Sequence, residues 1–344
     1  MIKSTLNKIA SGEDLTRGEM EGAMSQIMGG EATPAQIGGF ITGLRVKGET
    51  VDEIAGAAAI MREKATKIEP KVANGEVVID TCGTGGDGKN TFNISTAAAL
   101  VAAGAGAVVA KHGNRSVSSR CGSADVLEAL GVNIDLEPRE LEKCIEEVGI
   151  GFLFAPKLHG AMKHAVGPRR ELGIRTIFNI LGPLTNPAGA SAQLLGVYDP
   201  GLVEVIAEVL KALGSERAMV VNGSGTDELT TAGPSAVSYL KEGGIENFTV
   251  EPEKLGLKTT KLEYLRGGDS AENALIIKSI LKGADSPKRD VVVLNSAAAL
   301  IVAGLSPDFE AGIEMAADSI DGGRANKTLE RLVEFTKAHG QKNG

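Results

Sequence analysis

The first 70 residues carry a hydrophobic and polar pattern that is helical throughout. Thr16 and Glu19 stand three positions apart, as do Thr50 and Glu53, which is the spacing of a capping box at the start of a helix. Thr33-Pro34 places a capping residue directly before a proline, the preferred residue at the first position of a helix. Since the segment contains no strand-like run, we predict that it is all helical.

After residue 70 the pattern changes to short apolar runs that alternate with helical segments. We predict strands at 77–80, 107–110, 150–154, 192–198 and 218–222, and helices at 94–103, 124–130, 138–148 and 203–213. This alternation is typical of a parallel sheet in an α/β domain. The strand signal is absent from 159 to 187, and the last 50 residues are mainly helical.

The composition is that of an ordinary globular protein of about two domains. The chain has 344 residues, of which 42% are hydrophobic and 23% charged, and a domain holds roughly 150 residues. A net charge of -8 and the absence of Trp argue against a nucleic-acid partner. Cys82, Cys121 and Cys144 are too few and too scattered for a disulfide framework or a zinc site, which favours thiols in a reducing cytosol.

The N-terminus and the apolar stretches give no sign of targeting. The chain begins with an ordinary polar segment rather than a secretory signal. The apolar stretches at 94–110 and 291–305 are shorter than the roughly 18 residues that indicate a membrane span. We therefore expect a cytoplasmic protein without a membrane partner.

A glycine-rich turn at 80–90 lies between the first predicted strand and the following helix. It contains the dinucleotide-binding spacing G-x-G-x-x-G, but the acidic residue required about 20 positions later is missing, because no carboxylate occurs between Asp87 and Asp125. It also contains G-x-x-x-x-G-K, but Asn90 stands where a P-loop has Ser or Thr, and Asp87 would repel a triphosphate. Neither of these nucleotide-binding classes is favoured.

Both nucleotide-binding patterns share one physical feature, a glycine-rich turn between a strand and a helix, and this chain has that feature. Glycines after a strand let backbone N–H groups approach an anion closely. The start of the following helix, near Ser95 and Thr96, adds a favourable dipole. A turn that only reverses the chain is the alternative, which four glycines within 83–88 disfavour. The turn therefore predicts a phosphate site.

The segment between Asp87 and Asp125 is basic in an otherwise acidic chain. Its donors are Lys89, Lys111, His112, Arg115 and Arg120, with the hydroxyl groups of Ser116, Ser118, Ser119 and Ser123. Residues 111–115 follow a predicted strand, as the glycine-rich turn does. Both should lie at the C-terminal edge of the sheet, where open α/β sheets bind ligands. A solvated basic loop is the alternative.

Two pairs of charged residues complete the candidate chemistry. Asp227 and Glu228 follow the strand at 218–222 on a glycine-containing loop, where we expect them outside the core. Adjacent carboxylates there can converge on Mg²⁺, and a solvated turn is the alternative. Arg169 and Arg170 follow Pro168 at the expected start of a helix, and a guanidinium fork matches a carboxylate. Surface salt bridges are the alternative for this pair.

The ordered set of motifs resembles the anthranilate phosphoribosyltransferase family. The matching stretches cover the chain from about 10 to 340 and comprise 80–87, 93–96, 111–119, 168–170 with 172–173, 175–187 and the Asp227-Glu228 pair. The resemblance implies transfer of the 5-phosphoribosyl group from phosphoribosyl pyrophosphate (PRPP) to the amine of anthranilate. It also implies Mg²⁺ as the cofactor and a place in tryptophan biosynthesis.

The same resemblance implies a fold shared with pyrimidine nucleoside phosphorylases. A small helical domain would comprise 1–70 with a returning segment at about 159–190. A larger α/β domain with a central, mostly parallel sheet would comprise 71–158 and 191–344. Family members are usually homodimers through the helical domain, with the active site in the cleft between the domains.

The resemblance also assigns residues to the substrates. PRPP would be surrounded by Gly83, Gly86, Asp87, Thr91, Asn93, Ile94, Ser95, Thr96, Lys111, His112, Gly113, Asn114, Arg115, Ser116, Val117, Ser118, Ser119 and Ser123. Mg²⁺ would face Ser95, Asp227 and Glu228. Anthranilate would contact Gly83, Asn114 and Arg169, with His112 and His159 as weaker candidates for lining its pocket.

The implied reaction needs charge neutralisation more than an acid or a base. Pyrophosphate leaves as the ribose gains oxocarbenium character, which Mg²⁺ and basic donors stabilise, and the aromatic amine needs only orientation. We find no dedicated general base. Two alternatives remain: a nucleoside phosphorylase of the same fold, disfavoured by the Asp227-Glu228 and Arg169-Arg170 pairs, and a nucleic-acid-binding relative without catalysis, disfavoured by the pI near 5.3.

Overall fold

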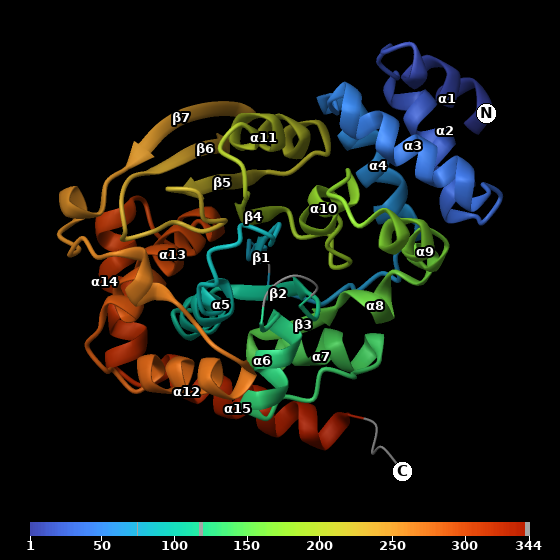
Figure 1. The fold of residues 1–344 in the computed structure, drawn as a ribbon. Helices are drawn as coiled ribbons and strands as arrows, with labels where there is room; N and C mark the ends of the chain where they lie inside the picture. The colour runs from blue at the N-terminus through green and yellow to red at the C-terminus, as the bar shows by residue number, and fades with distance from the viewer. Residues whose placement is uncertain (74, 117–119, 341–344) are drawn as a thin grey trace.

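A helical bundle lies beside a large α/β unit in the computed structural model, which describes residues 1–73, 75–116 and 120–340 (Figure 1). The bundle begins with α1 (Ile2–Ala10), α2 (Arg17–Met28), α3 (Pro34–Lys47) and α4 (Val51–Lys64). The side chains of Thr16, Thr33 and Thr50 each accept a hydrogen bond from the backbone N–H three residues later. The predicted helical segment and its caps are confirmed.

One sheet forms the centre of the α/β unit within the described ranges. Its strands are β1 (Val78–Gly83), β2 (Val108–Gly113), β3 (Ile150–Phe154), β4 (Ala192–Gly196), β5 (Arg217–Gly223), β6 (Ser235–Lys241) and β7 (Gly244–Val250). They lie in the order β3-β2-β1-β4-β5-β6-β7. Pairing is parallel from β3 to β5 and antiparallel from β5 to β7. The predicted α/β class with a mostly parallel sheet is confirmed.

Helices follow most of the strands, and more of them close the chain. After β1 and β2 come α5 (Ile94–Gly104), α6 (Ser123–Leu130) and α7 (Pro138–Val148). After β3 come α8 (Ala155–Leu158), η1 (Gly160–Met162), α9 (Lys163–Leu172), α10 (Phe178–Leu181) and η2 (Gly182–Leu184), and after β4 comes α11 (Leu202–Ala212). The remainder is η3 (Pro252–Leu255), η4 (Leu262–Leu265), α12 (Ser270–Leu281), α13 (Pro287–Ala303), α14 (Phe309–Asp321) and α15 (Arg324–His339). Among the described residues, no helix combines the length and apolar character needed to cross a bilayer.

The order of the strands reverses beside β1. The chain passes from β1 to β2 on one side, whereas it passes from β4 to β5 in the opposite direction. Gly83 at the end of β1 lies in register with Gly196 at the end of β4. Ligands of open α/β sheets bind where such a reversal occurs, outside the carboxyl ends of the strands. The ends of β1 and β4 therefore define the expected site.

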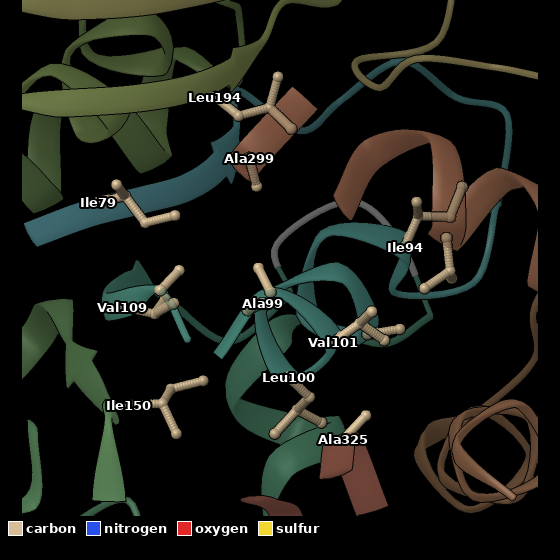
Figure 2. Packing of buried hydrophobic residues seen from close by; sticks show 14 of the residues in the cluster. Ile79, Ile94, Ala99, Leu100, Val101, Val109, Ile150, Leu194, Ala299 and Ala325 are labelled. Carbon is tan, nitrogen blue, oxygen red and sulfur yellow. The ribbon is translucent and has the colours of Figure 1, made fainter. Parts of the chain in front are cut away.

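Two apolar clusters hold these parts together. In the first, α5 packs on the sheet, with Ala99 facing Ile79 and Val109, while Leu100 points toward Ala325 of α15 (Figure 2). In the second, α1 to α4 pack with α9, α10 and α11 against the residues of β4 and β5 that do not face α13. The second cluster therefore joins the helical bundle to the sheet at the strands that border the reversal.

Two features of the fold differ from the sequence-based expectation. The β6–β7 hairpin escaped prediction because four of the seven residues of β7 are exposed, so this strand carries no buried apolar run. The arginine pair does not open a helix: Pro168 lies inside α9, and Arg169 and Arg170 form its last turn. The division of the chain into two domains at residues 70, 158 and 190 stays a prediction.

Candidate functional site

The glycine-rich turn leaves β1 and folds over the end of β4. Gly85 and Gly86 have φ angles of 67° and 75°, in the left-handed region that favours glycine. The Thr84 N–H donates to the carbonyl of Gly196 at 2.9 Å, and the Tyr198 N–H donates to Thr84 Oγ1 at 3.1 Å. The turn is therefore anchored at the point where the strand order reverses.

Asp227 crosses the ends of both strands. Its Oδ2 accepts the Gly85 N–H at 2.6 Å. A Cβ on Gly83 would lie 2.3 Å from that oxygen, and a Cβ on Gly196 would lie 1.6 Å from the Asp227 carbonyl. Only glycine fits at these two strand ends, because a side chain at either would displace the acidic loop.

Glu228 reaches the start of α5. Its Oε1 accepts the Ser95 N–H at 3.1 Å, at the end of the helix where the dipole favours a negative charge. The structure therefore brings the acidic loop to the glycine-rich turn and the helix start, which precede it in the sequence by more than a hundred residues.

Asp227 and Glu228 are harder to ionise than ordinary carboxyl groups. Burial raises the pKa of Asp227 to about 7, with a further contribution from Asp87. Burial raises the pKa of Glu228 to about 8, and neighbouring Asp227 adds to the shift. Asp87 Oδ2 is buried and has no hydrogen-bond partner in the described part of the chain. Neither Asp227 nor Glu228 belongs to the buried core, as expected, although both are partly buried beside the ends of β1 and β4.

Lys111 is the buried cation of this cluster. Its Nζ donates to the Thr81 carbonyl and, at 3.3 Å, to Ser95 Oγ, and its positive charge opposes the raised pKa values of Asp80 and Glu228. Buried Asp80 accepts the His112 N–H at 3.0 Å and the Asn186 amide at 2.8 Å. Burial outweighs the positive charge of Lys111, because the pKa values of Asp80 and Glu228 remain raised.

The oxygen ligands here suit a hard divalent cation. Mg²⁺ takes one or two carboxylates and completes its octahedron with waters and substrate phosphates. Ser95 Oγ, Asp227 and Glu228 provide oxygen donors of this kind, and the unpartnered Asp87 oxygen is close enough to raise the pKa of Asp227. No cluster of three or more His, Cys, Asp or Glu side chains arranged to hold a metal occurs in the described ranges. The residues fit Mg²⁺ that is shared with a phosphate ligand.

His112 and His159 form a buried pair whose ring centroids are 5.0 Å apart. Burial lowers the pKa of His112 to about 3, with a contribution from His159, and burial lowers the pKa of His159 to about 4. Nε2 of each ring is buried without a hydrogen bond in the described structure. Both imidazoles are therefore neutral at pH 7 and offer an unused ring nitrogen.

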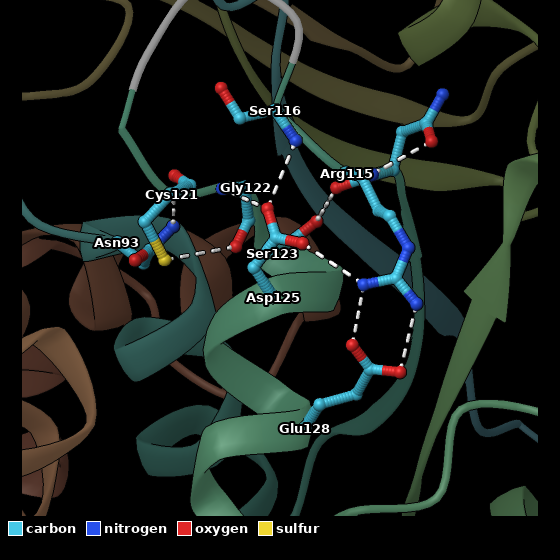
Figure 3. Close-up of polar contacts among 9 residues, drawn as sticks. Asn93, Arg115, Ser116, Cys121, Gly122, Ser123, Asp125 and Glu128 are labelled. Atoms are coloured by element: carbon cyan, nitrogen blue, oxygen red, sulfur yellow. Dashed lines mark hydrogen bonds and ion pairs between the residues drawn. The ribbon is translucent and has the colours of Figure 1, made fainter. Parts of the chain in front are cut away.

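The basic segment after β2 is less basic than its sequence indicates. Arg115 makes ion pairs with Asp125 and Glu128, the latter through both guanidinium nitrogens (Figure 3). Asp125 Oδ2 also accepts the N–H groups of Ser116 and Gly122 at 3.1 and 2.8 Å. The segment is thus less basic at Arg115 than expected, because acids of α6 just beyond the segment neutralise this side chain.

Other predicted contacts lie around this segment and at the start of α5. The carbonyl of exposed Asn114 accepts Ser123 Oγ at 3.3 Å. Asn93 donates to the Cys121 carbonyl at 3.2 Å and accepts the Asn273 amide at 2.9 Å. Ile94 and Thr96 are buried, and Thr91 forms a β-bridge with Arg266. Gly86 lies within the glycine-rich turn, and Gly113 is the last residue of β2. Val117, Ser118 and Ser119 lie outside the described residues.

Arg169 and Arg170 differ although they are neighbours. Arg169 is partly buried over the Phe178 ring, 5.0 Å from its centroid, and burial lowers the pKa of its guanidinium. No ion pair involves it among the described residues, whereas Arg170 is exposed. A partly desolvated arginine without an anion is suited to bind one from solution.

Sequence reasoning missed the residues that join these parts. Asp80 and Asn186 link β1 to the segment after η2, and Arg175 donates from the segment after α9 to the Gly86 carbonyl. Asn273 reaches Asn93 from α12. Each of these contacts joins positions at least 89 residues apart, so no local pattern could reveal them.

The fold and site define a two-domain glycosyl transferase. Residues 3–65 match the glycosyl transferase family, helical bundle domain, and residues 75–326 match the glycosyl transferase family, a/b domain. The chain is 54% identical to anthranilate phosphoribosyltransferase of Pelobacter propionicus over 98% of this chain and 100% of that one. It is 56% identical to that of Acetivibrio thermocellus, over 98% and 97%.

Solved structures agree with these sequence relatives. Anthranilate phosphoribosyltransferase from Thermus thermophilus superposes with a TM-score of 0.92 and 44% identity, over 97% of this chain and 99% of that one. The Saccharomyces cerevisiae protein in complex with PRPP and Mg superposes with a TM-score of 0.89 and 28% identity, over 98% of both chains. The chain belongs to the anthranilate phosphoribosyltransferase family.

Proposed function

We propose that the protein transfers the 5-phosphoribosyl group of PRPP to the amine of anthranilate and releases pyrophosphate, a step of tryptophan biosynthesis. This proposal rests on one observation: carboxylate groups and backbone N–H groups lie together at the point where the strand order reverses. Asp227 and Glu228 bind backbone N–H groups of the glycine-rich turn and of the start of α5. Carboxylates for a metal and N–H groups for phosphates are thereby placed at one point.

PRPP would lie along the turn, the start of α5 and the segment after β2. The residues assigned to it remain Gly83, Gly86, Asp87, Thr91, Asn93, Ile94, Ser95, Thr96, residues 111–119 and Ser123. Support comes from the left-handed glycines, which expose the backbone to an anion, and from the N-terminal dipole of α5. Arg115 would act mainly by shaping the loop, because its charge is already paired.

Mg²⁺ would be held by Ser95, Asp227 and Glu228 together with pyrophosphate oxygens. When bound, it would neutralise the charge that develops on the leaving pyrophosphate. The raised pKa values of Asp227 and Glu228 support this assignment, since carboxyl groups that repel each other are stabilised as anions by a cation between them.

Anthranilate would contact Gly83, Asn114 and Arg169. The partly buried guanidinium of Arg169 would bind the carboxylate and so direct the neighbouring amine toward the ribose carbon. The neutral rings of His112 and His159 would line the pocket, since neither carries a charge at pH 7.

Chemistry at this site would require orientation and charge stabilisation. The bond from the ribose carbon to the pyrophosphate oxygen breaks, and the amine nitrogen forms the new bond to that carbon. Lys111 would help to stabilise the leaving phosphates, and the released proton would pass to pyrophosphate or to water. Neutral aromatic amines are nucleophilic without deprotonation, so a general base is not required.

We also propose a homodimer formed through the helical bundle. Val46 on α3 is 82% exposed and Val166 on α9 is 50% exposed, and α3 packs directly against α9. Apolar side chains on adjacent helices of the bundle favour contact with a second copy. Sedimentation equilibrium should give twice the monomer mass, and a monomer at micromolar concentration would contradict this part of the proposal.

The loss of anthranilate fluorescence tests the reaction directly. Purified protein should consume anthranilate only when PRPP and Mg²⁺ are both present. The alternative of a nucleoside phosphorylase predicts turnover of thymidine with phosphate and no turnover of anthranilate. That second result would overturn the proposal.

A further inference from the structure

Arg175 connects the segment after α9 to the glycine-rich turn. Its Nη2 donates to the carbonyl of Gly86, and its guanidinium lies 4.3 Å from the centroid of the Tyr198 ring. Tyr198 follows β4, and its own N–H is bound by Thr84 Oγ1 in the same turn. Arg175 therefore contacts both the turn and the strand end on which the turn is anchored.

This contact fixes the orientation of one peptide in the turn. Asp227 Oδ2 holds the N–H of Gly85, and Arg175 holds the carbonyl of Gly86. Since a trans peptide is planar, fixing the Gly86 carbonyl points the N–H of Asp87 to the opposite side of the turn. Both glycines have positive φ and lack a Cβ, so few other restraints act on these peptides.

The same short segment also contacts the arginine proposed to bind anthranilate. Phe178, three residues after Arg175, lies under the guanidinium of Arg169 at 5.0 Å. One segment therefore touches the proposed carboxylate site through Phe178 and the proposed phosphate site through Arg175. A displacement of this segment would change the separation of the two sites.

The geometry points to Arg175 as a positioning residue that sets the distance between the amine of anthranilate and the ribose carbon of PRPP. This inference rests on the proposed function. Arg175 acts through the Gly86 carbonyl and the Tyr198 ring and need not touch either substrate. A guanidinium can donate to the carbonyl while its plane stacks on the ring, whereas an ammonium group cannot stack in this way.

Steady-state kinetics with both substrates test the inference. In Arg175→Gln we expect kcat to fall about ten- to a hundredfold, because small misplacements of reacting groups have effects of this size. Both Michaelis constants should change by less than about threefold, because the groups that bind each substrate remain. Arg175→Lys should recover part of the loss. Arg139→Gln, at an exposed arginine of α7, is the matched control and should keep wild-type kinetics.

Tyr198 provides the second arm of the experiment. Tyr198→Leu removes the ring and keeps the backbone N–H that binds Thr84, so kcat should fall by less than in Arg175→Gln. The double variant should resemble Arg175→Gln alone, because the two residues act through one contact. Additive losses in kcat would overturn the inference.

Other outcomes separate the inference from the proposed function. A rise in the Michaelis constant of PRPP alone would make Arg175 a direct ligand, and wild-type kcat in Arg175→Gln would remove its role entirely. Either result overturns the inference while leaving the reaction intact. Wild-type protein that fails to consume anthranilate with PRPP and Mg²⁺ would instead refute the proposed function.

Discussion

Two acidic sites in this protein, one buried and one partly buried, differ in how the surrounding groups stabilise their negative charge. In the helical bundle, Glu53 is fully buried and accepts the N–H groups of Leu15 and Thr50, while the ammonium of Lys47 lies 3.0 Å from its Oε2. At the ends of β1 and β4, Asp227 and Glu228 have one backbone donor each from the neighbouring segments and face another carboxyl group.

This difference indicates that Glu53 stabilises the fold, whereas Asp227 and Glu228 are available to bind a ligand. Every oxygen of Glu53 has a donor within the protein, so its charge contributes to the bundle itself. The acidic pair is partly buried without enough positive charge, which costs stability in the absence of a cation. Perturbed pKa values arising from burial and like charges are typical of functional sites.

Removing the charge of the pair should have the largest effect on activity. In Asp227→Asn with Glu228→Gln, the amides keep the shape but no longer attract Mg²⁺, whose catalytic contribution is several kcal/mol. We expect turnover at limiting Mg²⁺ to fall at least about a hundredfold. The melting temperature should stay the same or rise, because like-charge repulsion is gone. Wild-type turnover in this variant would make the pair a solvated turn.

The corresponding change at Glu53 should show the opposite pattern. Glu53→Ala leaves the partly buried Lys47 with Asp14 as its remaining ion-pair partner among the described residues, and it removes the acceptor of the Thr50 N–H in the capping box of α4. Breaking a buried ion pair costs about 3–5 kcal/mol. Urea unfolding should show this loss, while kcat at a temperature where the variant is folded should be unchanged. A loss of kcat without a loss of stability would contradict the comparison.

Replacing Arg169 should have a smaller and more selective effect on the kinetics. Arg169→Ala should raise the Michaelis constant of anthranilate about ten- to a hundredfold, since a charge-assisted hydrogen bond contributes about 1.5–3 kcal/mol. The constant for PRPP should change little, and Arg169→Lys should recover only part of the loss. Arg170→Ala is the control, because that side chain is exposed. Equal weakening toward both substrates would make Arg169 structural.

His159 should produce the smallest effect, which we expect on the pH dependence of stability. Its folded-state pKa is lowered to about 4, below the ordinary value of 6.5. The unfolded chain binds more protons between these values, so stability that is present above pH 6.5 is lost as the pH falls toward 4. Between pH 7 and pH 5 this loss is about 2 kcal/mol.

The variant His159→Asn isolates this contribution. Asp227 and Glu228 have raised pKa values and change stability with the opposite sign, but they are present in both proteins and cancel in the comparison. Urea unfolding of the variant should therefore lose about 2 kcal/mol less than the wild type between pH 7 and pH 5. Equal losses would mean that His159 is accessible to protons in the folded state.

The sequence could predict the features that depend on residues close to one another along the chain. The caps at Thr16, Thr33 and Thr50 depend on residues three positions away, and the strands before Gly83 and Gly113 are short apolar runs. The order of parallel strand ends then brought the glycine-rich turn and the acidic loop to one edge, which pattern alone can indicate.

What the sequence could not predict depends on contacts between distant segments. Arg115 pairs with Glu128 in the structure, which neutralises its charge. The sequence shows that no acid lies between Asp87 and Asp125, but it does not show that an acid beyond this segment pairs with Arg115. The burial of Asp227 arises from its crossing of Gly83 and Gly196. The mostly exposed β7 is stabilised by pairing with β6, which in turn pairs with β5, rather than by a buried apolar run of its own.

The most direct test of the central claim is a crystal structure of the protein with PRPP and Mn²⁺ in place of Mg²⁺, because Mn²⁺ scatters anomalously. The account predicts an anomalous peak bounded by the side chains of Asp227 and Glu228, with pyrophosphate oxygens completing its coordination beside the glycine-rich turn. An anomalous peak elsewhere, or PRPP bound away from the ends of β1 and β4, would contradict it.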